Sequence, residues 1–271
     1  TPSGGGTDLT ATMVFAASGA KDSDFDGLPD DIEFAIGTNQ SGKDTDKDGI
    51  DDFTEIQQGL DPLGGFGIPV GVVSAVGLQG TAQAVAVSGS MAGSSNLTEL
   101  VATGTYGLAT IDVSQFTQPR VLSQLDLSGN SIDLATDTTR GVAVMAAGDA
   151  GLHIVDVSNL AAPVLRQTIA FADPVDGVEV RDGTAYVATG TQIAVVDLNT
   201  GDVGQTIDFA SSGGGTITDL AIDGSILYSL DSNRNLRSLS MAGSSLAVLD
   251  SVAVPKAGKK LFVGGGVAYV G

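Results

Sequence analysis

Two stretches of the sequence carry carboxylates at a regular spacing that suits the coordination of a metal ion. The first spans residues 22–33 and the second spans residues 44–55. Each stretch places an oxygen-bearing side chain at positions 1, 3, 5, 9 and 12, and a glycine at position 6, which is Gly27 or Gly49. Calcium takes about six to eight oxygen ligands, and a loop with this spacing wraps them around one ion.

We therefore predict about two calcium ions, one in each loop. The glycine permits the bend that turns the carbonyl of position 7 towards the ion, and the glutamate at position 12 closes the cage. The charge cluster also has a simpler interpretation, an acidic and solvated linker, but linkers rarely show this ligand periodicity. The predicted ligands are Asp22, Asp24, Asp26, Leu28, Asp30 and Glu33 in the first loop, and Asp44, Asp46, Asp48, Ile50, Asp52 and Glu55 in the second.

A short helix is expected at the end of each loop. Pro29 suits a first helical turn, residues 32–36 give one apolar side, and Gly37 can end the helix. Residues 53–59 repeat that arrangement. The loops differ from an ordinary EF-hand, because turn-like sequence precedes each of them and position 8 holds Pro29 or Asp51 instead of an apolar residue.

Residues 21–62 resemble the thrombospondin type 3 repeat in its cysteine-free bacterial form. The resemblance includes the intervening Gly37-Thr38-Asn39 and the closing Gly59-Leu60-Asp61-Pro62. It implies calcium-dependent rigidity rather than calcium sensing. Without the ion, the crowded carboxylates repel one another, so we expect calcium removal to melt this segment. Residues 1–20 are interpreted as an N-terminal strand or linker.

An internal repeat marks the rest of the chain. The sequence LVATGTYGLATIDVS from Leu100 matches VMAAGDAGLHIVDVS from Val144, a third copy begins at Tyr186, and a degenerate fourth begins at Leu227. The corresponding residues near the end of the four copies, 44, 41 and 43 positions apart, are Asp112, Asp156, Asp197 and Ser240.

Each repeat holds about four strand-length apolar runs, and a period of roughly 40–45 residues with four strands is typical of a β-propeller blade. The second unit, for example, divides into runs at residues 131–136, 141–147, 152–157 and 164–170. We predict a mostly β fold. Residues 63–271 form a β-propeller-like domain of about five four-stranded units, the last incomplete, behind a calcium-binding segment (residues 21–62) with two short helices.

The first two units resemble the bacterial LVIVD-type propeller repeat. The resemblance lies in LHIVDVSN at residues 152–159 and LATIDVS at residues 108–114, with the family's following proline at Pro163 and Pro119. The third and fourth units lose most of this signature. The lack of tryptophan argues against a WD40 protein proper.

The sequence is compatible with two arrangements at the ends of the propeller-like domain. Residues 69–78 resemble an isolated outer strand, and residues 260–263 and 267–270 supply two strands of a fifth unit. These pieces either join into one shared blade or the natural chain continues. We favour continuation, because an open edge at Val270 invites pairing with another chain. The start at Thr1 likewise suggests a processed product or a piece of something longer.

Catalytic signatures are weak, and we expect no enzyme activity. His153 is the single histidine, at a position that holds Ala109 in the first unit, so we interpret it as an ordinary strand residue. The triple glycines at residues 213–215 and 264–266 lack the Lys-Ser/Thr of a phosphate loop. The aspartates that end the repeats are expected to order turns through their own side chains.

Composition narrows the function classes. A net charge of −20 makes nucleic acid and anionic membranes poor partners, and the chain has no long apolar stretch for direct membrane insertion. The absence of cysteine excludes disulfides and thiolate zinc sites. We expect a calcium-stabilised structural or adhesive module of a larger bacterial cell-surface or secreted protein, with self-assembly as an option. The alternative is a propeller that recognises a surface glycan or protein, and a propeller enzyme ranks third.

Overall fold

The computed structural model divides the chain into two compact units. The first comprises residues 1–76, 89–97 and 112–119, and the second comprises residues 77–88, 98–111 and 120–271. The residues that the structure describes are 21–58, 60–64, 74–88, 97–115, 118–242, 245–255 and 258–271. The strand or linker expected over residues 1–20 and the helix end expected at Gly59 lie outside them.

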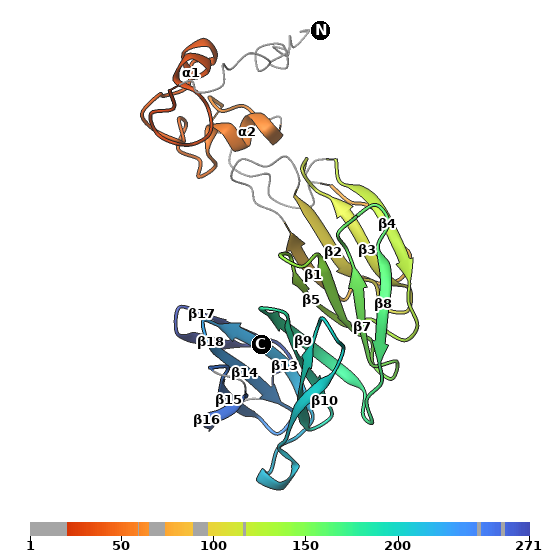
Figure 1. Ribbon diagram of the computed structural model, residues 1–271. Coiled ribbons are helices and arrows are strands. Elements are labelled where there is room, and N and C mark those ends of the chain that lie inside the picture. The colour runs from red at the N-terminus through yellow and green to blue at the C-terminus, as the bar shows by residue number, and fades with distance from the viewer. Residues whose placement is uncertain are drawn as a thin grey trace. The chain divides into compact units, whose positions relative to one another are not determined.

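The first unit contains the two expected short helices, α1 (Asp30–Ile36) and α2 (Asp52–Gln58) (Figure 1). Pro29 stands at the N-cap of α1 in an extended conformation. Gly37 ends α1 in the left-handed conformation, with φ 95°, and its N–H donates to the carbonyl of Glu33. Gly37 therefore ends α1 as the sequence predicts, whereas Pro29 lies one residue before the first turn that it was expected to occupy. No helix among the described residues is long and apolar enough to span a membrane.

The second unit is a series of antiparallel sheets in which consecutive strands pair (Figure 1). Four sheets have four strands each and a fifth has two, which confirms the predicted propeller-like fold. Blade 1 is β1 (Ala84–Ser88), β2 (Thr98–Ala102), β3 (Gly107–Asp112) and β4 (Arg120–Asp126); blade 2 is β5 (Asp133–Asp137), β6 (Val142–Ala146), β7 (Leu152–Asp156) and β8 (Val164–Ile169). Blade 3 is β9 (Val175–Arg181), β10 (Thr184–Thr189), β11 (Gln192–Asp197) and β12 (Val203–Asp208). Blade 4 is β13 (Ile217–Asp223), β14 (Ile226–Asp231), β15 (Asn235–Ser240) and β16 (Ala247–Ala253), and the last sheet is β17 (Leu261–Gly264) with β18 (Val267–Val270).

Neighbouring blades meet along their first strands. β5 contacts β1 and β9, and β13 contacts β9 and β17. The core lies between the blades, where alternate side chains of one sheet pack on the next. One cluster joins Val144 and Ile154 of blade 2 to Val178 and Val187 of blade 3. Because each blade buries its apolar residues only against its neighbours, the repeat in sequence becomes a repeat of the same interface.

Carboxylates on the first strands also tie the blades together. Asp133 and Asp137 of β5 accept hydrogen bonds from the backbone N–H groups of Val178 and Gly183 in the next blade, both at 2.9 Å. Asp219 of β13 accepts one from Leu261 at 2.7 Å. The motif Asp-Leu-Ala-x-Asp occurs in both strands, at residues 133–137 and 219–223, so the sequence contains a signal for these contacts.

The isolated outer strand expected over residues 69–78 is not seen in the part that the structure describes. Residues 74–78 form no strand, and residues 69–73 lie outside the described ranges. Within the described residues, the last sheet consists of β17 and β18 alone. The shared closing blade is therefore absent from the described part of the chain.

Candidate metal centre

The two acidic loops fold in the same way, and their own aspartates shape them. Asp22 accepts hydrogen bonds from the N–H groups of Phe25 (2.8 Å) and Gly27 (3.2 Å). Asp44 does the same with Lys47 (2.7 Å) and Gly49 (2.9 Å). One oxygen of the carboxylate at each loop's position 1 thus fixes position 4, and the other fixes position 6.

Positions 3 and 5 each use one carboxylate oxygen on the backbone. Asp24 accepts from the N–H of Asp26 at 3.2 Å, and Asp26 accepts from the N–H of Leu28 at 2.6 Å. In the second loop Asp46 accepts from Asp48 at 3.1 Å, and Asp48 accepts from Ile50 at 2.9 Å. These bonds hold the chain in a tight curl around a common centre.

The backbone is strained to make that curl. Phe25 and Lys47, at position 4 of their loops, have φ angles of 63° and 64°. Gly27 and Gly49 have φ angles of 107° and 100°. A left-handed conformation costs a non-glycine residue about 1 kcal/mol or more, so the loops require compensating interactions.

Several of the other carboxylate oxygens are buried and lack a hydrogen-bond partner. Among the described residues, buried carboxylate oxygens without a hydrogen-bond partner occur at Asp24, Asp26 and Glu33 of the first loop, and at Asp48 and Glu55 of the second. Both oxygens of Glu33 belong to this set. A buried and unpartnered carboxylate costs several kcal/mol, on the order of a lost charge-assisted hydrogen bond or more. A cation in each loop removes that cost, so the residues present fit calcium.

Distances support the same conclusion. The carboxylates of Asp22, Asp24 and Asp26 each offer an oxygen within 4.8 Å of the others, and so do those of Asp44, Asp46 and Asp48. Two oxygens that bind one calcium ion at about 2.3–2.6 Å lie at most about 5 Å apart, so this spacing is compatible with a shared ion.

The raised pKa values of Glu33 and Glu55 indicate that their ionised forms are unfavourable without a cation. Burial, with the nearby charges of Asp24 and Asp26, raises the pKa of Glu33 to about 7. Burial and the charges of Asp46 and Asp48 raise the pKa of Glu55 to about 7. A divalent ion would reverse both effects, because it stabilises the ionised form.

Position 9 has a different environment from the other predicted ligands. The carboxylate of Asp30 accepts hydrogen bonds from the N–H of Ser23 (2.8 Å), its hydroxyl (2.9 Å) and Lys21 Nζ (2.8 Å). Asp52 accepts from the N–H (2.8 Å) and hydroxyl (2.6 Å) of Thr45. In loops of this kind position 9 often binds the ion through a water molecule, which these bonds permit. The Ser or Thr at position 2 is the partner that the sequence interpretation missed, and its recurrence in both loops was the available signal.

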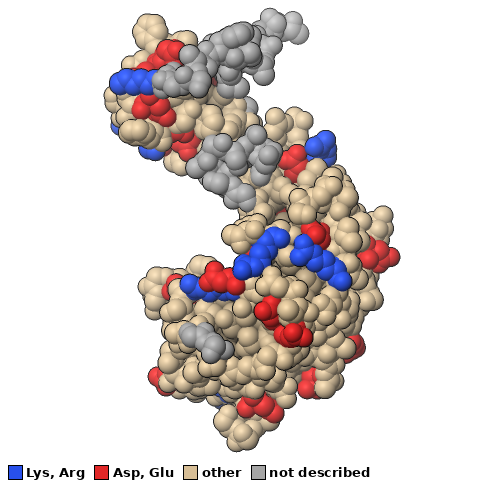
Figure 2. All heavy atoms as spheres, viewed as in Figure 1, with Lys and Arg blue, Asp and Glu red and all other residues tan. Residues whose placement is uncertain are grey.

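The two loops also contact each other. Lys43, which precedes the second loop, donates to the carbonyl of Phe25 at 2.6 Å. The N–H of Asp52 donates to the carbonyl of Lys43 at 2.7 Å, just as that of Asp30 donates to Lys21 at 2.8 Å. Figure 2 shows acidic side chains on the surface of this part of the chain, with basic side chains among them. Residues 21–58 thus form one interlocked pair of acidic loops.

Outside the acidic loops, His153 was the candidate for a catalytic side chain, and its imidazole is held by two hydrogen bonds. His153 is fully buried in β7, where Nε2 lies 2.8 Å from the carbonyl of Ser128 and Nδ1 lies 2.9 Å from the hydroxyl of Thr168. Because a carbonyl only accepts, Nε2 donates to Ser128. His153 is therefore a strand residue with both nitrogens engaged.

The aspartates that end the repeats order turns, as predicted. Asp112 accepts from the N–H of Ser114 at 3.0 Å, and Asp156 accepts from that of Ser158 at 2.9 Å. Asp197 accepts from the N–H of Asn199 at 2.7 Å. Each is a local turn contact two residues along the chain, so these carboxylates do not form a ring.

Solved structures share the fold of the second unit. The structure of U3-55K has 14% identity and a TM-score of 0.51 over 64% of this chain and 53% of its own. The structure of Saccharomyces cerevisiae Sqt1 has 10% identity and a TM-score of 0.55 over 67% of this chain and 52% of its own. The computationally designed Ika8 protein has 15% identity and a TM-score of 0.53 over 72% and 56%. This chain spans about half the length of these structures, and at such identities the similarity concerns the fold alone.

The family model that matches this chain covers only a short part of it. The search of curated proteins found no match to this chain. Residues 143–170, which run from β6 to the end of β8 in blade 2, match the LVIVD repeat. The propeller-like unit therefore contains an LVIVD repeat.

Proposed function

We propose that this chain is a calcium-stabilised structural or adhesive module of a larger bacterial cell-surface or secreted protein, without enzyme activity. One calcium ion occupies each acidic loop and stiffens the segment, and the propeller-like unit presents a binding surface to a protein or glycan. The observation that carries the proposal is the set of buried carboxylate oxygens without partners in both loops, at Glu33 and Glu55 above all.

Several features support this assignment over calcium sensing. The sequence of residues 21–62 resembles cysteine-free thrombospondin type 3 repeats, and the helices α1 and α2 have only seven residues each. A sensor exposes a new surface by moving long helices around its loop. Short helices that follow tightly interlocked loops are better suited to a rigid and ion-filled segment.

The ion supplies positive charge that neutralises the crowded carboxylates, and the chain's own residues supply the shape. Asp22 and Asp44 hold the loop backbone, while Glu33 and Glu55 reach back from the helices to close each loop. The strongly acidic surface suits divalent cations and disfavours nucleic acid.

The test is calcium titration of the intact chain by calorimetry. We expect two sites in the unmodified chain. Glu33→Gln should remove or weaken the first site, and Glu55→Gln the second, because each loses a charged ligand that closes its loop. Asp31→Asn is the matched control, since Asp31 is an exposed residue of α1 whose carboxylate accepts from the neighbouring N–H of Ile32.

Limited proteolysis provides a second readout. We expect chelator to make residues 20–62 sensitive to protease and calcium to protect them. Equal cleavage with and without chelator, or calcium binding that Asp31→Asn weakens as much as Glu33→Gln, would contradict the proposal.

A further inference from the structure

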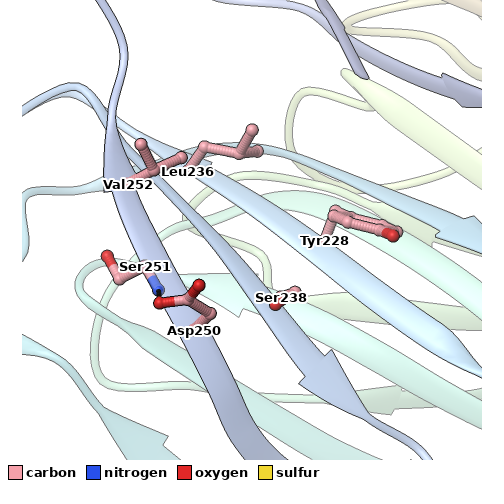
Figure 3. A pocket seen from close by; sticks show the side chains of 6 residues that line it. All are labelled: Tyr228, Leu236, Ser238, Asp250, Ser251 and Val252. Carbon is pink, nitrogen blue, oxygen red and sulfur yellow. Dashed lines mark hydrogen bonds between the residues drawn. The ribbon is translucent and has the colours of Figure 1, made fainter. Parts of the chain in front are cut away.

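Blade 4 has a hollow over β14, β15 and β16 (Figure 3). The residues that line it are Tyr228, Leu236, Ser238, Asp250, Ser251 and Val252. Its carboxylate, that of Asp250, accepts a hydrogen bond from the N–H of the adjacent Ser251 at 2.7 Å. This contact stays within one strand. The side chain of Gln58 in α2, by contrast, makes a contact between segments that are far apart in the chain.

The helix α2 joins the second acidic loop to a distant turn. Asp52 and Glu55, the predicted ligands at positions 9 and 12, lie in the first turns of the helix and are almost fully buried. At the other end of the helix, Nε2 of Gln58 donates to the carbonyl of Ser114 at 2.9 Å. Gln58 and Ser114 belong to the same compact unit, although they lie 56 positions apart in the chain. One seven-residue helix therefore carries both the predicted calcium ligands and the contact to the turn.

The β3–β4 turn (residues 112–119) that receives this contact is held by its own hydrogen bonds. Asp112 accepts from the N–H of Ser114 at 3.0 Å and from its hydroxyl at 2.6 Å. The N–H of Val113 donates to the carbonyl of Leu97 at 3.0 Å. Because these bonds fix the backbone around Ser114, its carbonyl is a preorganised acceptor.

Blade 2 repeats this turn and leaves it exposed. Asp156 accepts from the N–H of Ser158 at 2.9 Å and from its hydroxyl at 2.5 Å, as Asp112 does with Ser114 in blade 1. Ser158 is exposed, whereas the equivalent Ser114 is half-buried. The turn therefore forms through its own residues in both blades, and the greater burial of Ser114 coincides with the contact to α2.

The helix of the first acidic loop does not offer the same contact. Ile36 is the last residue of α1 and corresponds to Gln58 when the two loops are aligned. Its apolar side chain has no hydrogen-bond donor. A link of this kind through the helix is therefore confined to the second loop.

Helix α2 depends on the second loop for its own stability. A helix of seven residues is too short to persist by itself in water. Its first turns carry Asp52 and Glu55, which repel the other carboxylates of the loop when no cation is present. Loss of the ion therefore destabilises α2 and, with it, the position of Gln58.

We propose that Gln58 couples calcium in the second loop to the β3–β4 turn, so that the turn is held when the ion is bound and is released when the ion is removed. The inference rests on the proposed calcium binding and adds a segment outside the acidic loops that responds to the ion. Coupling between two sites is reciprocal, so the docked turn also strengthens calcium binding in the second loop by the same factor. One hydrogen bond between neutral groups corresponds to a factor of about two to ten.

Hydrogen–deuterium exchange of the full chain, in calcium and in chelator, measures the order of the turn. The N–H groups of Val113, Ser114 and Gln118 are hydrogen-bonded, so their exchange reports on the turn. We expect calcium to slow the exchange of residues 112–119 in the unmodified chain by about two- to tenfold.

Two variants of adjacent residues test the role of Gln58. Gln58→Leu lacks the donor, so it should abolish the effect of calcium on the turn while calcium still protects residues 21–58. Gln57→Leu is the matched control, because Gln57 is also a half-buried residue of α2 and the substitution changes the helix propensity equally. It should leave the response of the turn unchanged.

Calorimetry measures the reciprocal effect on calcium. In a Glu33→Gln chain, in which the first site is removed or weakened, the second loop dominates the titration. Gln58→Leu in that chain should lower the calcium affinity by about two- to tenfold, and Gln57→Leu should not.

The outcomes separate this coupling from the proposed function. Unchanged exchange of residues 112–119 on addition of calcium, with residues 21–58 protected, would overturn the coupling and leave the calcium sites intact. So would an equal response of the Gln57→Leu and Gln58→Leu chains. Absence of calcium binding to the unmodified chain would instead overturn the proposed function together with the coupling.

Discussion

Gly27 of the first acidic loop lies against the aromatic ring of Phe53 in α2, so that a Cβ atom at residue 27 would be 3.1 Å from Phe53 Cδ1. The first loop is therefore built against the helix that closes the second loop. Gly49, the equivalent residue of the second loop, has no atom within 4 Å of such a Cβ. The two glycines share a left-handed backbone but differ in their surroundings.

Substitution of Gly49 should therefore affect one acidic loop, whereas substitution of Gly27 should affect both. Gly49→Ala should weaken mainly the proposed second calcium site, by about 1–2 kcal/mol from backbone strain. Gly27→Ala adds a steric shift of Phe53, so it should weaken the first site and disturb the second as well. Calcium calorimetry of both variants measures this. Equal and local effects of the two substitutions would show that the Phe53 contact does not connect the loops.

Gln205 of β12 in blade 3 forms two hydrogen bonds with the backbone of Leu246 in blade 4. This contact between the blades leads to a second prediction. Gln205→Ala removes both hydrogen bonds to the backbone of Leu246 and leaves buried backbone groups without partners. We expect the free energy of unfolding to fall by about 1–3 kcal/mol in chemical denaturation. Asp250→Ala, a substitution of an exposed residue of β16, should cost less than about 0.5 kcal/mol. A similar loss at both positions would show that the hydrogen bonds of Gln205 add no stability of their own.

Two ion pairs of the second unit should differ strongly in their contribution to stability. Arg237 pairs with Asp231 at 2.7 Å, and both side chains are almost fully buried, with the guanidinium 4.4 Å from the ring centre of Phe209. Arg237→Met leaves the charge of Asp231 buried, so it should destabilise the fold by about 3–5 kcal/mol.

Arg166 and Asp156 provide the matched control for that variant. They also form a close pair, at 2.6 Å, but on the surface. Arg166→Met should change the free energy of unfolding by less than about 1 kcal/mol. Thermal or chemical denaturation of both variants compares the two, and a stable Arg237→Met protein would show that Asp231 is neutralised in some other way.

Carboxylates on the first strands of the blades should make stability depend on pH. Burial, together with the charges of Asp133 and Asp219, raises the pKa of Glu179 to about 7, and burial raises the pKa of Asp133 to about 6. Lys260 lies 3.9 Å from Asp219 and is the cation of this group. A carboxyl group whose pKa is higher in the folded state binds its proton more tightly there. The stability contributed by that proton is present at low pH and is lost as the pH rises from about 4.5 to about 7.

Glu179→Gln removes the charge that is unfavourable at high pH. We expect the variant to be more stable than the unmodified chain at pH 8, by on the order of 1–2 kcal/mol, and the difference to shrink towards pH 4.5. Melting curves in saturating calcium measure this, because the calcium proposed for the acidic loops would suppress their own titration. A difference that is constant across this range would exclude titration of Glu179 as its source.

The chain's own sequence specified much of this protein through local spacing. The positions of Asp22, Gly27 and Glu33 predicted a curled loop and a short helix, because the bends and the ligand spacing are properties of a dozen consecutive residues. The period from Asp112 to Asp156 and Asp197 predicted four-stranded blades and turns fixed by aspartate side chains. Both kinds of feature depend on contacts between residues that are close in the chain.

Tertiary structure decided what depends on residues far apart. Only the packed loops show that Asp30 is held by Ser23 and that Gly27 meets Phe53. Only the stacked blades show that Gln205 of blade 3 is hydrogen-bonded to the backbone of Leu246 in the next blade. The partner of Gln205 lies 41 residues further along the chain, so the strand's own sequence does not encode this contact.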